Sequence, residues 1–141
     1  MRAVVQRVTR AAVEVDGILV SQIGSGLVAF VGVTHNDSAA ASVALAGKIH
    51  GLRILRGERS VADSPDAAVL VVSQFTLYGD ARRGRRPTWA AAAPGPVAEP
   101  LVSGVTEELR RRGAVVATGL FGADMRVDMV NDGPFTVLVE V

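Results

Sequence analysis

The chain of 141 residues contains no cysteine, and this absence excludes disulfides, thiolate metal sites and cysteine nucleophiles together. Aromatic residues make up only 4% of the sequence although 49% of it is hydrophobic, so small aliphatic side chains must fill the core. Polar residues interrupt every apolar run well short of the roughly 18 residues that a membrane span needs, and the first residues lack the apolar stretch of a signal peptide. We therefore expect a soluble, cytoplasmic protein with no membrane association.

Positive charge is concentrated in two places although the formal net charge is only +1. Arg110, Arg111 and Arg112 form one run. Arg82, Arg83, Arg85 and Arg86 surround a glycine, close to Trp89. Four guanidinium groups beside an aromatic ring suit phosphates and a stacked base. The alternative, a solvated loop with acidic neighbours, has equal weight at this point.

Hydrophobic periodicity predicts a single domain over residues 1–141 in the α+β class. An alternating pattern predicts a strand over 2–15, the Asp16-Gly17 pair predicts a hairpin into 18–23, and a third strand over 27–33 would complete an antiparallel meander. Helices are expected from Asp37 or Ser38, as the capping residue, to Gly51, and from about Pro96 to Arg112. Further strands are expected at 52–55, 67–74, 114–120, 125–130 and 135–141. The whole indicates a curved, mainly antiparallel sheet or barrel covered by two helices.

Side-chain catalysis has few candidates in this sequence, because His35 and His50 are its only histidines. Nucleophile and base triads are therefore hard to assemble, and no His, Asp or Glu cluster has the spacing of metal ligands. We expect no metal and no cofactor.

The end of the apolar strand at 67–74 is the first candidate site, because the strand runs into the polar segment Ser73-Gln74-Phe75-Thr76. Hydroxyls, an amide and free backbone N–H groups would meet there, and such N–H groups can stabilise an oxyanion by about 3 kcal/mol each. Ser73 or Thr76 could instead be nucleophiles, but neither has a visible base. An ordinary strand end with locally bonded hydroxyls explains the pattern equally well.

A second candidate is Asn131-Asp132-Gly133-Pro134, between two apolar segments. Asn-Asp-Gly is typical of a turn, and proline fixes the backbone after Gly133. A cis Gly133–Pro134 bond is possible, and on the residues alone the segment is a hairpin turn.

Six segments, in order along nearly the whole chain, resemble the D-aminoacyl-tRNA deacylases. They are residues 1–8, 27–35, 73–78, 83–87, 121–125 and 131–134.

The resemblance implies a homodimer that hydrolyses the ester of D-aminoacyl-tRNA, rejects L-amino acids and also removes glycine mischarged on tRNA(Ala). It implies that Ser73, Gln74, Phe75 and Thr76 line the ester pocket, with the N–H of Phe75, helped by that of Thr76, stabilising the oxyanion. Gly133-Pro134 would be a Gly-cis-Pro element that one subunit presents to the other subunit's site, with Arg7 supporting it and Met125 lining the pocket. The 2′-hydroxyl of the terminal adenosine would assist catalysis, and the loop arginines would bind tRNA.

Two features depart from the family pattern: the stretch 56–66 is shorter than usual, which we read as a trimmed surface loop, and Phe135 stands where valine is commoner. Two other functions compete with the deacylase. One is a non-enzymatic RNA-binding module that uses the arginine loop and Trp89. The other is a serine or threonine esterase of small molecules.

Overall fold

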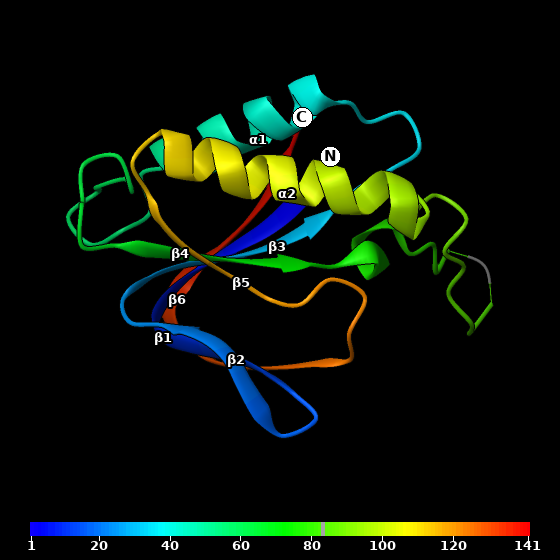
Figure 1. Ribbon diagram of the computed structural model, residues 1–141, viewed down its shortest axis with the longest axis horizontal. Helices are drawn as coiled ribbons and strands as arrows, with labels where there is room; N and C mark the ends of the chain where they lie inside the picture. Colours follow the sequence, from blue (N-terminus) through cyan, green and yellow to red (C-terminus); the bar gives the residue numbers. More distant parts are fainter. Residues whose placement is uncertain (83) are drawn as a thin grey trace.

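Six strands form one strongly curved, nearly closed sheet in the computed structural model, which describes residues 1–82 and 84–141 (Figure 1). Two helices lie together on one side of the sheet, as expected. In chain order the elements are β1 (Arg2–Val15), β2 (Ile18–Ile23), β3 (Gly26–Gly32), α1 (Ala39–Gly51), β4 (Ala68–Ser73), the short 3₁₀ helix η1 (Phe75–Tyr78), α2 (Gly95–Arg111), β5 (Val115–Thr118) and β6 (Met125–Glu140).

The long strand β1 organises the sheet, because it pairs antiparallel with three other strands. The Asp16-Gly17 hairpin joins β1 to β2, as predicted, and both turn residues have positive φ. β3 pairs with the first half of β1 and β2 with the second half, while β6 pairs along nearly the whole strand. The predicted meander is therefore wrong, since β3 follows β2 in sequence but pairs with β1.

Parallel pairing completes the other side of the sheet, where β4 lies between β3 and β5. The helix α1 precedes β4 and α2 precedes β5, so each connection crosses one face of the sheet as a parallel link requires. The residues of β4 from Ala68 to Val72 are all buried, which confirms the prediction from its continuous apolar run. The sheet is consequently mixed, with three antiparallel and two parallel pairings.

Three predicted strands differ from the structure. Residues 52–55 form no strand and make only an isolated bridge between Leu55 and Arg59. Residues 125–140 form one strand, β6, instead of two strands with a hairpin between them. Long pairing with β1 overrides the local turn signal, and the extra residues near Asn131 are absorbed by two register shifts around Val8 of β1.

Small aliphatic side chains fill two cores, one on each face of the sheet. The larger core lies between the sheet and the helices and contains Leu27, Leu45, Ile49, Val105 and Leu109. The second core contains Val13, Val28 and Leu70 and lies against the second half of β1 and the first half of β6. No aromatic residue is fully buried in the described part of the chain. Each buried leucine contributes about 1.5–3 kcal/mol, so many small contacts replace a few aromatic ones.

The helix ends follow the sequence in part. Ser38 stands at the N-cap of α1, but neither its side chain nor that of Asp37 caps the helix: the Asp37 carboxylate accepts the N–H of Thr34 instead. Pro96 lies in the first turn of α2, as predicted, whereas Pro100 lies inside the helix. At the other end, Glu108 accepts hydrogen bonds from the side chains of Arg111 and Arg112. None of the helices in the described residues is long and apolar enough to cross a membrane.

Candidate active site

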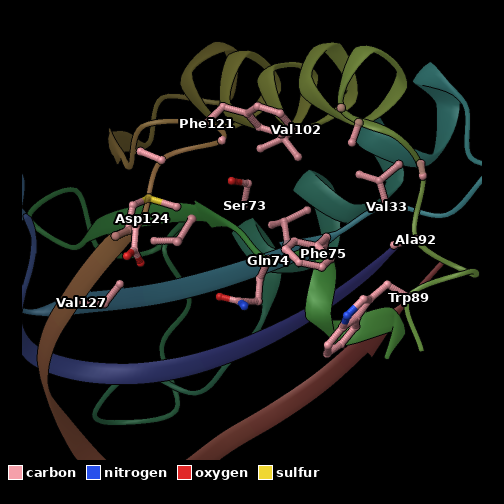
Figure 2. Close-up of a pocket in the computed structure, with 18 residues that line it drawn as sticks. Val33, Ser73, Gln74, Phe75, Trp89, Ala92, Val102, Phe121, Asp124 and Val127 are labelled. Atoms are coloured by element: carbon pink, nitrogen blue, oxygen red, sulfur yellow. The ribbon is translucent and has the colours of Figure 1, made fainter. Parts of the chain in front are cut away.

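A cleft of about 550 Å³ opens where β4 ends, between η1, the start of α2 and the segment that leads into β6. Figure 2 shows Ser73, Gln74 and Phe75 on one side of it, with Val102 and Phe121 opposite. Most of the lining is apolar, and its polar side chains are Ser73 and Gln74 at the end of β4 and the carboxylate of Asp124 just before β6. A concave, mainly apolar space of this size with a few convergent polar groups is typical of a small-molecule or substrate site.

The chain changes direction at the end of β4, and this change frees backbone donors. The N–H of Gln74 makes the last bond to β3, donating to the carbonyl of Val31 at 2.8 Å. Phe75 and Thr76 then begin η1, and the first N–H groups of a helix have no partner within it. Elsewhere in the described backbone, no carbonyl accepts a bond from either N–H group. Two adjacent donors are therefore available beside the cleft.

The hydroxyl groups of this segment have no base. The Thr76 hydroxyl accepts a hydrogen bond from the Gln74 amide, which is a donor and cannot remove a proton. The ring of His35 contacts the carbonyl of Ala90 at 2.9 Å. Within the described residues, no histidine or carboxylate is hydrogen-bonded to the hydroxyl of Ser73 or Thr76. This geometry favours backbone donors over a side-chain nucleophile.

Trp89 ties the arginine-rich loop to the cleft. Its ring meets that of Phe75 edge to face, with centroids 5.5 Å apart. The same ring lies so close to Gly79 that an added Cβ would be 2.5 Å from Trp89 Cζ3. Gly79 directly follows η1, so the indole packs against both ends of the turn that carries the free N–H groups.

Met125 lies at the start of β6 and lines the cleft together with residues 121–124, as the resemblance implied. Its sulfur packs against Gly119, where an added Cβ would lie 2.5 Å from it. Because β6 begins at Met125, pairing with Val15 of β1 fixes this side of the cleft.

Gly133 and Pro134 lie outside the cleft of their own chain, since neither is among the residues that line it. The peptide bond between them is cis. Arg7 is buried beneath the segment, and its guanidinium donates to the carbonyls of Asp132 at 3.0 Å and Gly133 at 3.4 Å. The ring of Phe135 lies over the same guanidinium, 4.6 Å from it. Arg7 thus supports the segment, and Phe135 adds a contact that valine would lack.

The four predicted tRNA-binding arginines differ in their surroundings. Arg85 and Arg86 are exposed, whereas Arg83 lies outside the described residues. Arg82 forms a two-pronged ion pair with Asp80, and these hydrogen bonds hold the pKa of the Asp80 carboxyl at about 2. Asp80 is therefore ionised at neutral pH and neutralises Arg82.

The part of the chain that the structure describes contains no group of three or more His, Asp or Glu side chains placed to hold a metal ion. Sequence reasoning missed the start of α2, where Gly95, Ala98 and Val102 line the cleft. The signal that could have identified them is a set of small side chains at the proline-rich start of a helix. Sequence reasoning also missed the contact between Arg56 and Asp132, which lie 76 residues apart in the sequence.

The fold and the cleft define an α+β protein with a substrate-sized site that offers backbone N–H and amide groups, and in the described residues no base is bonded to its hydroxyls. A family model described as D-Tyr-tRNA(Tyr) deacylase matches residues 4–140. A protein of Beutenbergia cavernae named D-aminoacyl-tRNA deacylase is 64% identical over 99% of both chains. The chain belongs to this deacylase family, and it is therefore a hydrolase that acts on ester bonds.

Solved structures share the fold of this chain. The structure titled c-Myc DNA Unwinding Element Binding Protein has 38% sequence identity and a TM-score of 0.92, covering 100% of this chain and 99% of that one. One titled as a probable eukaryotic D-amino acid tRNA deacylase has a TM-score of 0.87 at 16% identity, covering 99% and 98%, and shows the shared fold. Membership in a family of hydrolases favours the enzyme over the non-enzymatic RNA-binding module.

Proposed function

We propose that this chain, as one domain over residues 1–141, hydrolyses D-aminoacyl-tRNA to tRNA and the free D-amino acid, and also removes glycine mischarged on tRNA(Ala). One observation carries the mechanism: the backbone N–H group of Phe75, which lines the cleft, and that of Thr76 next to it donate to no backbone carbonyl of the described residues, and the hydroxyls of Ser73 and Thr76 beside them have no base bonded to them. Such donors stabilise the negative charge that develops on the ester carbonyl oxygen when water attacks.

The reaction needs a water molecule, an oxyanion site and a route for one proton. Water adds to the ester carbonyl, and the tetrahedral intermediate places its oxyanion on the N–H groups of Phe75 and Thr76. The C–O bond to the ribose then breaks, and the 3′-oxygen of the terminal adenosine takes up the proton that the water lost. The neighbouring 2′-hydroxyl lies within reach of both oxygens and assists this transfer. Ser73 and Gln74 position the ester, which the enclosed cleft holds in place.

Selection of the D-enantiomer would come from a second copy of the chain. Gly133 and Pro134 lie outside their own cleft, and the strand that carries them is largely exposed, with Leu138 and Phe135 among its exposed apolar residues. A homodimer would cover this strand and bring its Gly133–Pro134 carbonyls to the partner's cleft. A D-residue can direct its ammonium group to these acceptors, whereas the Cβ of an L-residue would clash with the backbone.

The tRNA itself would lie along the loop of residues 80–89. Arg85 and Arg86 are exposed at this loop, and Trp89 connects it to the cleft. Guanidinium groups at that position suit the phosphates of the acceptor end, while Arg82 is partly neutralised by Asp80. Because charged tRNA is the substrate, we place the enzyme in the cytoplasm.

Replacement of Thr76 by alanine tests the mechanism. The Thr76→Ala variant keeps the backbone N–H, so we expect D-tyrosyl-tRNA deacylation to persist within about tenfold of the wild-type rate. L-tyrosyl-tRNA should remain intact in both reactions, and no acyl-enzyme should be trapped by acid quench. Complete loss of deacylation with folding and tRNA binding intact, or a trapped Thr76 ester, would establish a threonine nucleophile instead.

A further inference from the structure

Arg7 is a hub that holds the segment Asn131–Phe135 from below. It is only 7% exposed, yet its guanidinium has partners on several sides. Besides the carbonyls of Asp132 and Gly133 and the ring of Phe135, it reaches the carbonyl of Ile54 at 3.0 Å. A buried arginine satisfied in this way fixes the backbone that it contacts, because each lost bond would leave a buried N–H donor of a charged group without a partner.

The side chain of Asp132 adds a second arginine to this hub. Its carboxylate lies 3.1 Å from Nε of Arg7 and is also gripped by Arg56, which donates from Nε at 3.0 Å and from Nη2. A two-pronged contact between guanidinium and carboxylate defines direction as well as distance. Asp132 is therefore held from both sides, by a buried arginine and by an arginine whose side chain is 77% exposed.

Arg56 belongs to a turn whose shape is itself fixed. The N–H of Leu55 donates to the carbonyl of Arg59 at 2.9 Å, and Gly57 and Glu58 have positive φ. The same turn follows Ile54, whose carbonyl binds Arg7. Residues 54–59 thus contact the hub twice, so the stretch that resembled a trimmed surface loop also braces the segment around Gly133.

We propose that Arg56 is a positioning residue for chiral selection, which acts through Asp132 on the Gly133–Pro134 segment. The inference rests on the proposed function of that segment as the wall that rejects L-residues. Without Arg56, Arg7 is the one arginine among the described residues that still contacts the Asp132 carboxylate, and Nε of Arg7 is already shared with the Asp132 carbonyl. The carboxylate would then compete more strongly for Nε of Arg7, and the hydrogen bond from Nε to the Asp132 carbonyl would weaken. The backbone around Gly133 would lose its fixed position.

The effect should fall on selectivity and not on the chemical step. Arg56 does not line the cleft, and no hydrogen bond joins it to the described residues 73–76. If the Gly133–Pro134 segment is displaced, the L-ester can enter the cleft, while the backbone N–H groups that stabilise the oxyanion stay in place. Because Arg56 is exposed, its pairing with Asp132 is also screened by salt.

The experiment compares kcat/KM for D-tyrosyl-tRNA and L-tyrosyl-tRNA in wild type and in Arg56→Gln. We expect the D-to-L ratio to fall about fivefold in Arg56→Gln, the range of a partly exposed ion pair, mainly through faster L-ester hydrolysis with kcat for the D-ester retained. The wild-type ratio should decline between low and high salt, and the ratio of Arg56→Gln should not. Arg56→Lys keeps the charge but loses the two-pronged contact with Asp132, so its D-to-L ratio should lie between those of wild type and Arg56→Gln.

Arg59→Gln is the matched control, because Arg59 lies in the same turn but donates to the carbonyl of Asp63. It should keep the wild-type ratio. An unchanged ratio and an unchanged salt response in Arg56→Gln would overturn the role of Arg56 while leaving the deacylase intact. Wild-type protein that spares the D-ester, or hydrolyses both esters equally, would instead refute the proposed function. Equal loss of selectivity in Arg56→Gln and Arg59→Gln would reduce Arg56 to general support of the turn and would also refute the inference.

Discussion

Replacement of Gly79 by alanine tests whether Trp89 holds η1 in place, the turn that carries the proposed oxyanion donors. Gly79 has φ −67° and ψ 132°, an ordinary conformation for any residue, so alanine introduces no backbone strain. Its Cβ would, however, lie 2.5 Å from Cζ3 of Trp89 and 3.0 Å from the carbonyl oxygen of Thr76. Normal carbon contacts are about 3.5–4.0 Å, so the indole must recede by about 1 Å.

The consequence of this displacement can be estimated from the contacts that Trp89 makes. Its edge-to-face contact with Phe75 is worth about 0.5–1.5 kcal/mol, and overpacking costs about 1–3 kcal/mol, so Gly79→Ala should be about 2 kcal/mol less stable. A shift of about 1 Å in a catalytic group can cost up to about 100-fold in rate. Because Phe75 carries the proposed oxyanion donor, we expect kcat for D-tyrosyl-tRNA to fall by about 10- to 100-fold.

Urea unfolding and single-turnover deacylation measure the two effects separately. Gly24→Ala is the matched control, because nothing lies within 4 Å of its added Cβ and it should keep both stability and rate. In a variant with Trp89→Ala, the additional change at Gly79 should cost little further activity, since the clash with the indole, which is the closest one, is gone. A Gly79→Ala enzyme with wild-type kcat would refute the coupling between Trp89 and the turn, whatever its stability.

Three further predictions follow from contacts outside the cleft. Phe135→Val should lower the free energy of unfolding by about 1 kcal/mol in urea titrations because it removes the ring over Arg7; an unchanged midpoint would contradict this. Asp80→Asn should release Arg82 for phosphate, so tRNA should bind more tightly and the slope of log K against log salt should steepen by about 1; an unchanged slope would mean that Arg82 does not reach the RNA. Hydrogen bonds from neighbouring arginines hold the pKa of Glu108 at about 2, below its ordinary 4.5, so its stabilisation is present above pH 4.5 and is lost as the pH falls toward 2. Thermal unfolding of Glu108→Gln should show a weaker decline over this pH range, and an identical decline would exclude the pair as its cause.

Local signals in the sequence predicted the elements that depend on local structure. The Asp16-Gly17 pair specified a hairpin, and the apolar run that ends at Ser73 specified a buried strand, because in both cases the decisive residues are adjacent in sequence. The segment at Asn131 was predicted as a hairpin for the same reason. There the prediction failed, because pairing with the distant strand β1 decides whether β6 continues, and a turn signal carries no information on that pairing.

The candidate site shows the same division. Ser73, Gln74 and Phe75 were candidates from the residues themselves and Met125 from the resemblance, and these four line one cleft. Thr76, the other predicted pocket residue, follows Phe75 in η1 and is not among the lining residues. The neighbours of Arg56 could not be predicted, because its partner Asp132 is 76 residues away in the sequence. In addition, the segment that contains Asp132 was predicted as a hairpin turn, whereas it is part of β6. The roles of the site residues and of the loop arginines stay predictions until activity is measured.

The central claim is that each active site combines the cleft of one copy with Gly133 of the other, and a mixture of two defective variants tests it most directly. Gly133→Ala should fold normally, since its added Cβ meets nothing closer than Asn131 Oδ1 at 3.7 Å, yet its methyl group would obstruct the partner's substrate. Ser73→Phe should fill its own cleft and leave Gly133 intact. Each pure variant should be nearly inactive on D-tyrosyl-tRNA.

After subunit exchange at equal amounts, half of the dimers are mixed and one of their two sites is intact, so about a quarter of the wild-type rate should return. A mixture that stays as inactive as its components, with exchange verified by mass spectrometry, would show that each copy uses its own Gly133 and would contradict the account.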